Sequence, residues 1–97
     1  MTRKRSYRSK MRILADMMRT IQQEGREGAG PTKILYSANL SHDRLTQYLE
    51  ELITKKLIRE EEIDEQSRVY FLTEKGNDFL REFVKIERFS EAFGIEI

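Results

Sequence analysis

Apolar side chains recur at steps of three and four residues along several stretches of the chain, which is the pattern of helices that pack one face on a common core. The first stretch follows Ser9, which is a suitable N-cap. Its apolar face is made by Met11, Leu14, Met17, Met18 and Ile21. The segment 24–31 ends this pattern, because three glycines and the chain's only proline cannot continue a helix. We therefore predict a first helix between Ser9 and this segment.

Two more helices are predicted to follow, joined by a tight turn. The first of them is short and is capped by Thr32. Its apolar side is made by Ile34, Leu35 and Ala38. Asn39 and Leu40 form the turn, and Ser41 caps the next helix. The apolar stripe of that helix consists of Leu45, Leu49, Leu52 and Ile53. Two helices joined in this way behind a first helix form a helix-turn-helix.

The pattern then changes to two strand-like runs, at residues 57–63 and 68–72, joined by a polar turn at residues 64–67. Runs of this kind separated by a short polar turn predict a β-hairpin. A hairpin placed directly after a helix-turn-helix is a wing. The order of elements therefore predicts a mainly α fold with a small β-hairpin (α+β), namely a winged helix-turn-helix with an extra C-terminal helix.

The extra helix is predicted to begin at Glu74, with Thr73 as its N-cap, and to end at Gly94. Gly76 lies in its first turn. We interpret Gly76 as a packing position, where a side chain would hold the helix away from the sheet.

Aromatic and aliphatic side chains along this last helix form two stripes. One stripe can cover the domain's own core, and the second is more apolar surface than a monomer of this size should expose. The spacing of this second stripe is that of the contact positions of a coiled coil, and Ser90 stands at the one position where an apolar residue is missing. We predict a homodimer whose contact residues are Phe79, Phe83, Ile86, Phe89 and Phe93. The alternative is that the tail folds back on the first helix.

The composition fits one compact domain. The chain has 97 residues, of which 36% are charged and 38% are hydrophobic. It contains no apolar run as long as a membrane span and no signal-peptide pattern, so we expect a cytoplasmic (nucleoid) location. It contains no cysteine, which excludes disulfides and cysteine–zinc sites.

Charge is distributed unevenly along the chain. Residues 1–12 contain six basic side chains and no acidic one, whereas the whole chain carries a net charge of +1. We divide the chain into a basic flexible arm (1–8), the winged helix-turn-helix domain (9–73) and the C-terminal dimerisation helix (74–97). A basic arm on a mildly acidic body suggests an anionic partner for the arm. The alternative is a solvated, disordered tail.

Four short runs carry a resemblance to a known family: TKILYSANLS at 32–41, LTQYLEEL at 45–52, KLI at 56–58 and YFLTEKG at 70–76. Together they resemble the archaeal winged helix-turn-helix DNA-binding family that includes a small chromatin-associated protein dimerising through its C-terminal helix. The resemblance covers roughly residues 8–88. It implies binding to double-stranded DNA and dimerisation, whereas the periodicity alone predicts only the fold.

In this fold the third helix presents its N-terminal end to the major groove. Arg44 can pair with guanine and Gln47 with adenine through two hydrogen bonds each. The base-contact candidates are His42, Arg44, Thr46 and Gln47. The phosphate-contact candidates are Arg3, Lys4, Arg5, Arg8, Lys10, Lys33, Tyr36 and Ser41. For two of these residues alternatives stay open: His42 could be an idle surface residue and Tyr36 could be half-buried.

The wing is unusually acidic, with Glu60 to Glu62 before its tip and Asp64 and Glu65 in it. Carboxylates beside phosphates repel, so we expect the tip to stay off the DNA backbone or to contact a protein. Catalytic carboxylates need to converge in a cleft, and these lie on one exposed hairpin. We expect no enzyme activity, no cofactor and no metal site, since His42 has no second histidine or cysteine beside it.

These observations favour a double-stranded DNA-binding protein, either a transcriptional regulator or a nucleoid-associated protein. The alternative is a winged-helix protein-interaction module that uses the acidic hairpin. RNA binding through the arm is a third, weaker possibility.

Overall fold

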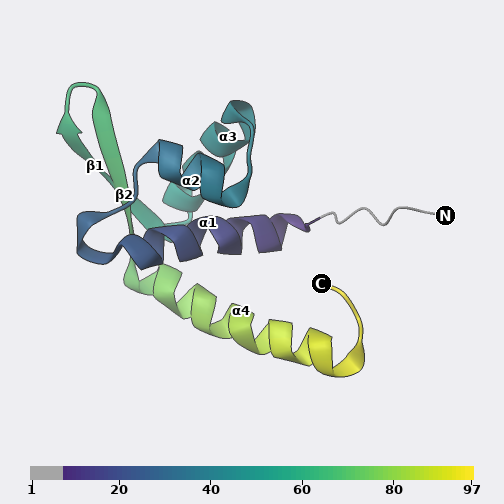
Figure 1. Cartoon of the computed structure of the whole chain (residues 1–97). Helices are drawn as coiled ribbons and strands as arrows, with labels where there is room; N and C mark the ends of the chain where they lie inside the picture. Colours follow the sequence, from purple (N-terminus) through teal and green to yellow (C-terminus); the bar gives the residue numbers. More distant parts are fainter. Residues whose placement is uncertain (1–7) are drawn as a thin grey trace.

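The computed structural model describes residues 8–97. The elements in chain order are α1 (Lys10–Glu24), the 3-10 helix η1 (Gly25–Glu27), α2 (Pro31–Ala38), α3 (His42–Thr54), β1 (Ile58–Asp64), β2 (Ser67–Leu72) and α4 (Glu74–Phe93). Helix α1 lies between the α2–α3 unit and α4, and the hairpin of β1 and β2 projects from one end (Figure 1). The predicted fold class is therefore confirmed. No helix within residues 8–97 is both long enough and apolar enough to cross a membrane.

Three of the predicted N-caps are confirmed. Ser9 Oγ, Ser41 Oγ and Thr73 Oγ1 each accept a hydrogen bond from the backbone N–H three residues further on, at 3.1, 3.2 and 3.1 Å. Each bond satisfies an N–H group that has no partner within its own helix.

The predicted cap of α2 at Thr32 is wrong. The helix begins at Pro31, two residues before the predicted first helical residue, and Gly30 precedes it in extended backbone. Proline suits a first helical position because its φ is already helical and that position needs no N–H donor. The turn after α2 is as predicted: Asn39 has φ of 56°, in the left-handed region that asparagine tolerates.

The hairpin is antiparallel, with Ile58 opposite Leu72 and Glu60 opposite Tyr70. Its turn is tighter than predicted, because β1 continues to Asp64 and β2 already begins at Ser67. A register irregularity between Glu62 and Asp64 accompanies this tight turn.

One residue of the connection between α1 and α2, Ala29, forms an isolated bridge with β2. Ala29 N donates to Tyr70 O at 3.0 Å, and Tyr70 N donates to Ala29 O at 2.8 Å. The preceding residue, Gly28, has φ of 75°, and a Cβ there would lie 2.8 Å from the ring of Phe71. The connection from α1 to α2 is thus bonded to β2, and it needs a glycine where it passes Phe71.

The core is built on α1, whose Met17 and Met18 have no exposed surface, and it extends through Ile34 of α2 and Leu52 of α3. Helix α4 approaches closely at its start. A Cβ on Gly76 would lie 2.1 Å from the carbonyl oxygen of Leu57, so the packing role predicted for Gly76 is confirmed.

Candidate nucleic-acid interface

The N-terminal half of α3 is presented to solvent. Its inner stripe of Leu45, Leu49 and Leu52 is buried in the core. The opposite side of the same helix carries the exposed residues His42, Asp43, Arg44, Thr46 and Gln47. Because the buried stripe fixes the rotation of α3, these five side chains are held on the outer surface.

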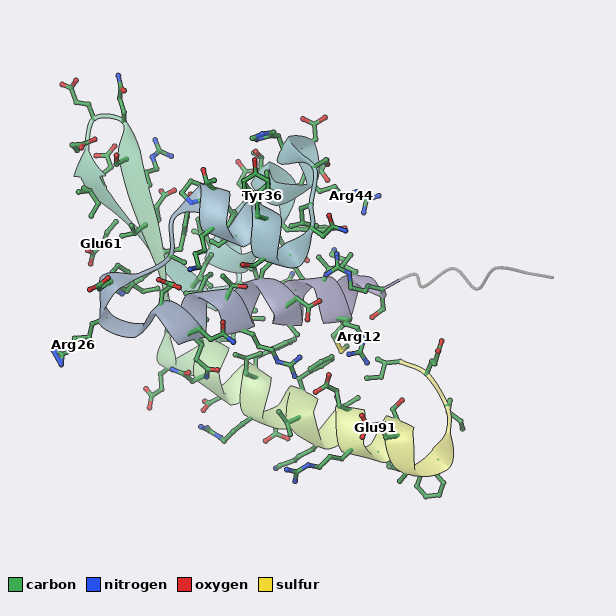
Figure 2. The ribbon with its side chains drawn as sticks, in the orientation of Figure 1. Arg12, Arg26, Tyr36, Arg44, Glu61 and Glu91 are labelled. Carbon is green, nitrogen blue, oxygen red and sulfur yellow. The ribbon has the colours of Figure 1, made fainter. Side chains whose placement is uncertain are left out.

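The four base-contact candidates do not point in one direction. His42 and Thr46 are one turn apart and both line a cleft that faces the hairpin, which Arg44 and Gln47 do not line. Thr46 Oγ1 donates to the carbonyl oxygen of His42 at 3.0 Å, so its proton is already used. Figure 2 shows Arg44 pointing away from the domain on the side of α3 opposite the hairpin. Among residues 8–97 Arg44 has no ion-pair partner, so its guanidinium is available to a ligand.

Tyr36 of α2 is 75% exposed, so the half-buried alternative is wrong (Figure 2). The other candidates at this surface already have partners in the chain. Lys33 Nζ lies 3.0 Å from a carboxylate oxygen of Glu24, and Ser41 Oγ is occupied as the cap of α3. An exposed pair such as Lys33–Glu24 contributes at most about 1 kcal/mol, so a phosphate can take over such a lysine.

Lys10 Nζ lies 2.9 Å from Glu51 Oε1. This hydrogen bond raises the pKa of Lys10 and lowers the pKa of Glu51. The pair connects the start of α1 with the C-terminal half of α3, and both side chains remain partly exposed.

Arg8 is not part of a free arm. Its guanidinium donates to Asp16 Oδ2 at 2.7 Å and also to the carbonyl oxygen of Ala38, the last residue of α2. Donors of Arg8 thus already serve α1 and α2, and its role as a phosphate contact stays a prediction. The other arm candidates, Arg3, Lys4 and Arg5, lie outside the described residues.

The described part of the chain is slightly acidic. The whole chain carries +1, and since Arg3, Lys4 and Arg5 contribute three positive charges, residues 8–97 carry −2. Both arginines of the wing are engaged with wing carboxylates: Arg59 with Glu61, and Arg68 with Glu60 at 3.4 Å. This pairing leaves the wing with an excess of carboxylates and supports the prediction that its tip stays off phosphate.

The five predicted dimerisation residues separate into two groups. Phe83 is only 1% exposed and belongs to the chain's own core, and Phe79 packs against that core. The prediction of Phe83 as a dimer contact is therefore wrong, because α1 already covers its side chain. Ile86, Phe89 and Phe93 stay exposed, at 41%, 65% and 65%. The tail after α4 turns back toward α1 (Figure 1), and Ile97 packs against the core, so part of the fold-back alternative is found.

Charged contacts connect α1 and α4 beside Phe83. Glu87 accepts a hydrogen bond from Arg12 at 2.9 Å and one from Arg19 at 2.6 Å. The guanidinium groups of Arg12 and Arg19 also lie over the ring of Phe83, at 5.7 and 5.5 Å from its centroid. These bonds, that of Arg19 above all, lower the pKa of Glu87. Sequence reasoning missed this contact. The available signal was the spacing of Arg12 and Arg19, seven residues apart on one helix face.

A helix-turn-helix followed directly by a hairpin, with the N-terminal end of its second helix exposed, defines a winged helix-turn-helix protein. The model of the winged helix-turn-helix family matches residues 7–91, and the chain belongs to this family. None of the curated protein sequences matches the chain significantly.

Several solved structures share this fold. Sso10a-2, a DNA-binding protein from Sulfolobus solfataricus, is 24% identical over 90% of both chains, with a TM-score of 0.70. AF1382 from Archaeoglobus fulgidus is 18% identical, with 86% of this chain and 91% of that chain covered and a TM-score of 0.69. These matches confirm the predicted resemblance to archaeal winged helix-turn-helix proteins.

The fold also occurs as part of larger proteins. ZitR of Lactococcus lactis, a zinc-responsive member of the MarR family, is 18% identical with a TM-score of 0.69. The match covers 93% of this chain and 62% of ZitR. At these identities the similarity establishes the fold.

Proposed function

We propose that this protein binds double-stranded DNA as a homodimer, with the N-terminal half of α3 in the major groove. The observation that carries the proposal is the exposed end of α3, capped by Ser41, on a fold shared with a DNA-binding protein. Arg44 and Gln47 are the base-reading residues, because they face away from the hairpin cleft and can form paired hydrogen bonds with guanine and adenine.

The basic arm supplies phosphate contacts in this proposal. Arg8 fixes the start of the described chain at the end of α2, next to the turn that leads into α3. Seven residues span at most roughly 25 Å, so Arg3, Lys4 and Arg5 are within reach of a duplex seated on α3. Lys10, Lys33 and Tyr36 lie closer to α3 and add contacts to the same backbone.

The exposed half of α4 supplies the dimer contact. Phe89 and Phe93 pack on each other with ring centroids 4.9 Å apart, and they continue the apolar surface of Ile86. A second copy of α4 would cover these rings. Sedimentation of the wild type should give the mass of two chains, and the double change Phe89→Ala with Phe93→Ala should give the mass of one. A monomeric wild type would contradict this arrangement.

The DNA-binding proposal is tested by fluorescence anisotropy with duplex DNA at two salt concentrations. Affinity should fall steeply with salt, with a log–log slope of about −0.9 for each phosphate neutralised. Deletion of residues 1–7 should lower affinity for every sequence alike. Arg44→Ala and Gln47→Ala should instead change sequence preference, with Arg88→Ala, at an exposed position of α4, as the control. Unchanged preference in both variants would remove the base-reading assignment.

The same assay separates a regulator from a nucleoid-associated protein. A regulator binds its own site roughly a thousandfold or more tighter than other DNA, whereas a packing protein binds all duplexes alike. A random duplex library selected for binding decides between the two.

A second candidate function is supported by the wing. Ile63 is 61% exposed in a strand of carboxylates, a combination suited to a basic protein partner with an apolar contact. Lack of duplex binding at low salt, together with an intact fold, would favour this protein-interaction module over the DNA-binding proposal.

A further inference from the structure

A cleft of about 520 Å³ lies between α2, α3 and the inner face of the hairpin. This volume is within the range of sites for small organic molecules. Leu35 of α2 and Leu45, Leu49 and Ile53 of α3 contribute to its lining. The cleft therefore has an apolar side, formed by the two helices of the helix-turn-helix.

The hairpin forms the polar side of the cleft. Glu60 and Tyr70 face each other across the two strands and both line the cleft, together with Arg68. Glu60 Oε2 accepts a hydrogen bond from the hydroxyl of Tyr70 at 2.9 Å. Burial, followed by this bond, raises the pKa of Tyr70 to about 12, so the hydroxyl keeps its proton and continues to donate to Glu60.

The charges around the cleft are mainly negative. Arg68, the only arginine or lysine in the lining, is already paired with Glu60. A second carboxylate, Glu50 of α3, also lines the cleft and forms no ion pair with any residue of the range 8–97. An anionic molecule would find no unpaired arginine or lysine here, whereas a cation would find the unpaired carboxylate of Glu50 and the carboxylate of Glu60, which it would share with Arg68 and Tyr70.

We propose that this cleft binds a small organic cation with a flat apolar body, such as an aromatic amine. The apolar body lies against the leucine side chains of α2 and α3, and the ammonium group points to Glu60 and Glu50.

The site has a consequence that rests on the proposed DNA binding. His42 and Thr46, at the exposed end of α3, line the same cleft. A molecule held there contacts the helix that would enter the major groove and changes the affinity for duplex DNA. The cation would thus be an effector.

The binding test uses 1-naphthylmethylamine as the cation and 1-naphthylacetate as the matched anion, each titrated into the full chain and followed by NMR. The amine should shift the signals of Leu35, Thr46 and Tyr70 in a saturable way, and the acetate should not. Glu60→Gln keeps the acceptor for the Tyr70 hydroxyl and should weaken amine binding about fivefold, the value of one partly exposed charge pair. Glu50→Gln should act in the same direction.

Glu61→Gln is the control, because Glu61 lies on the other face of the same strand and outside the cleft (Figure 2). No saturable shift with the amine, equal binding of the acetate, or equal loss in Glu61→Gln would overturn the cation site. Duplex affinity is measured separately at constant ionic strength with and without amine. A chain that binds the amine but no duplex refutes the proposed function and leaves the cation site standing.

Discussion

The two halves of α4 contain the same kinds of side chain in different surroundings. In the first half Gly76, Leu80 and Phe83 are buried against α1 and the hairpin base. In the second half Phe89 and Phe93 are each 65% exposed. Helix α1 runs antiparallel to α4, from Gln22 beside Asn77 to Arg12 beside Glu87, and its first residue is Lys10. Burial along α4 therefore follows the extent of α1, and the aromatic content of α4 does not determine it.

The largest effect is expected from a pair of matched changes, one in each half. Phe83→Ala removes a buried ring and should lower the free energy of unfolding by about 3–5 kcal/mol. Phe89→Ala, two residues after Glu87, which is bonded to α1, should leave the unfolding of the monomer nearly unchanged and reduce self-association. Denaturant unfolding and sedimentation measure the two results. Equal destabilisation by both changes would show that the halves do not differ in the way described.

A smaller loss is expected where α4 meets the hairpin base. Gly76→Ala introduces a Cβ at 2.1 Å from the Leu57 carbonyl oxygen, a distance that forces α4 to move. We expect a loss of about 1–3 kcal/mol in thermal or denaturant unfolding, despite the better helix propensity of alanine. Arg88→Ala, at an exposed position of the same helix, is the control and should be neutral. A stabilised Gly76→Ala variant would contradict the close approach.

The N-cap of α4 should contribute less to the free energy of unfolding than the close packing at Gly76. Thr73→Ala removes the acceptor for the N–H of Gly76 and the donor to the carbonyl oxygen of Lys56, which lies 2.6 Å away. The expected loss is about 1 kcal/mol in denaturant unfolding. Thr73→Ser retains the hydroxyl and should recover most of it; a serine variant as unstable as the alanine variant would assign the effect to the lost methyl group instead.

The smallest effect concerns Glu87, at the boundary between the two halves. Its pKa is lowered in the folded chain, so its contribution is complete above about pH 4.3, the ordinary glutamate value, and is lost as the pH falls through the folded pKa. Glu87→Gln should cost at most about 1 kcal/mol at neutral pH. The difference from wild type should shrink to zero in acid. A difference independent of pH would mean that the glutamate charge is not what connects the helices.

Local signals in the sequence predicted much of this fold. Ser9, Ser41 and Thr73 cap helices where the pattern placed them, because a cap depends only on residues within one turn. Thr32 failed as a cap because the adjacent Pro31 is better suited to open a helix. The pairing of Ala29 with Tyr70 was not predicted, since it joins segments far apart in the sequence that carry no shared pattern.

Part of the candidate site was also predictable, because it depends on local signals in the sequence. The exposure of Arg44 and Gln47 follows from the leucine stripe on the same helix. The roles of Arg8 and Phe83 depend on neighbours brought together by folding, namely the Ala38 carbonyl group for Arg8 and the arginines of α1 for Phe83. A charge count or a heptad spacing contains no information on such neighbours.

The two backbone hydrogen bonds between Ala29 and Tyr70 have a consequence for how the wing moves. A two-stranded hairpin alone is marginally stable in water, and here only its base is tied to the rest of the chain. We expect hydrogen exchange at the amides of Ala29 and Tyr70 to require opening of the whole domain. The amides between Arg68 and the tip of the wing should exchange through local opening. We therefore expect the tip of the wing to move relative to Tyr70, so that its carboxylates change position while the helices stay in place.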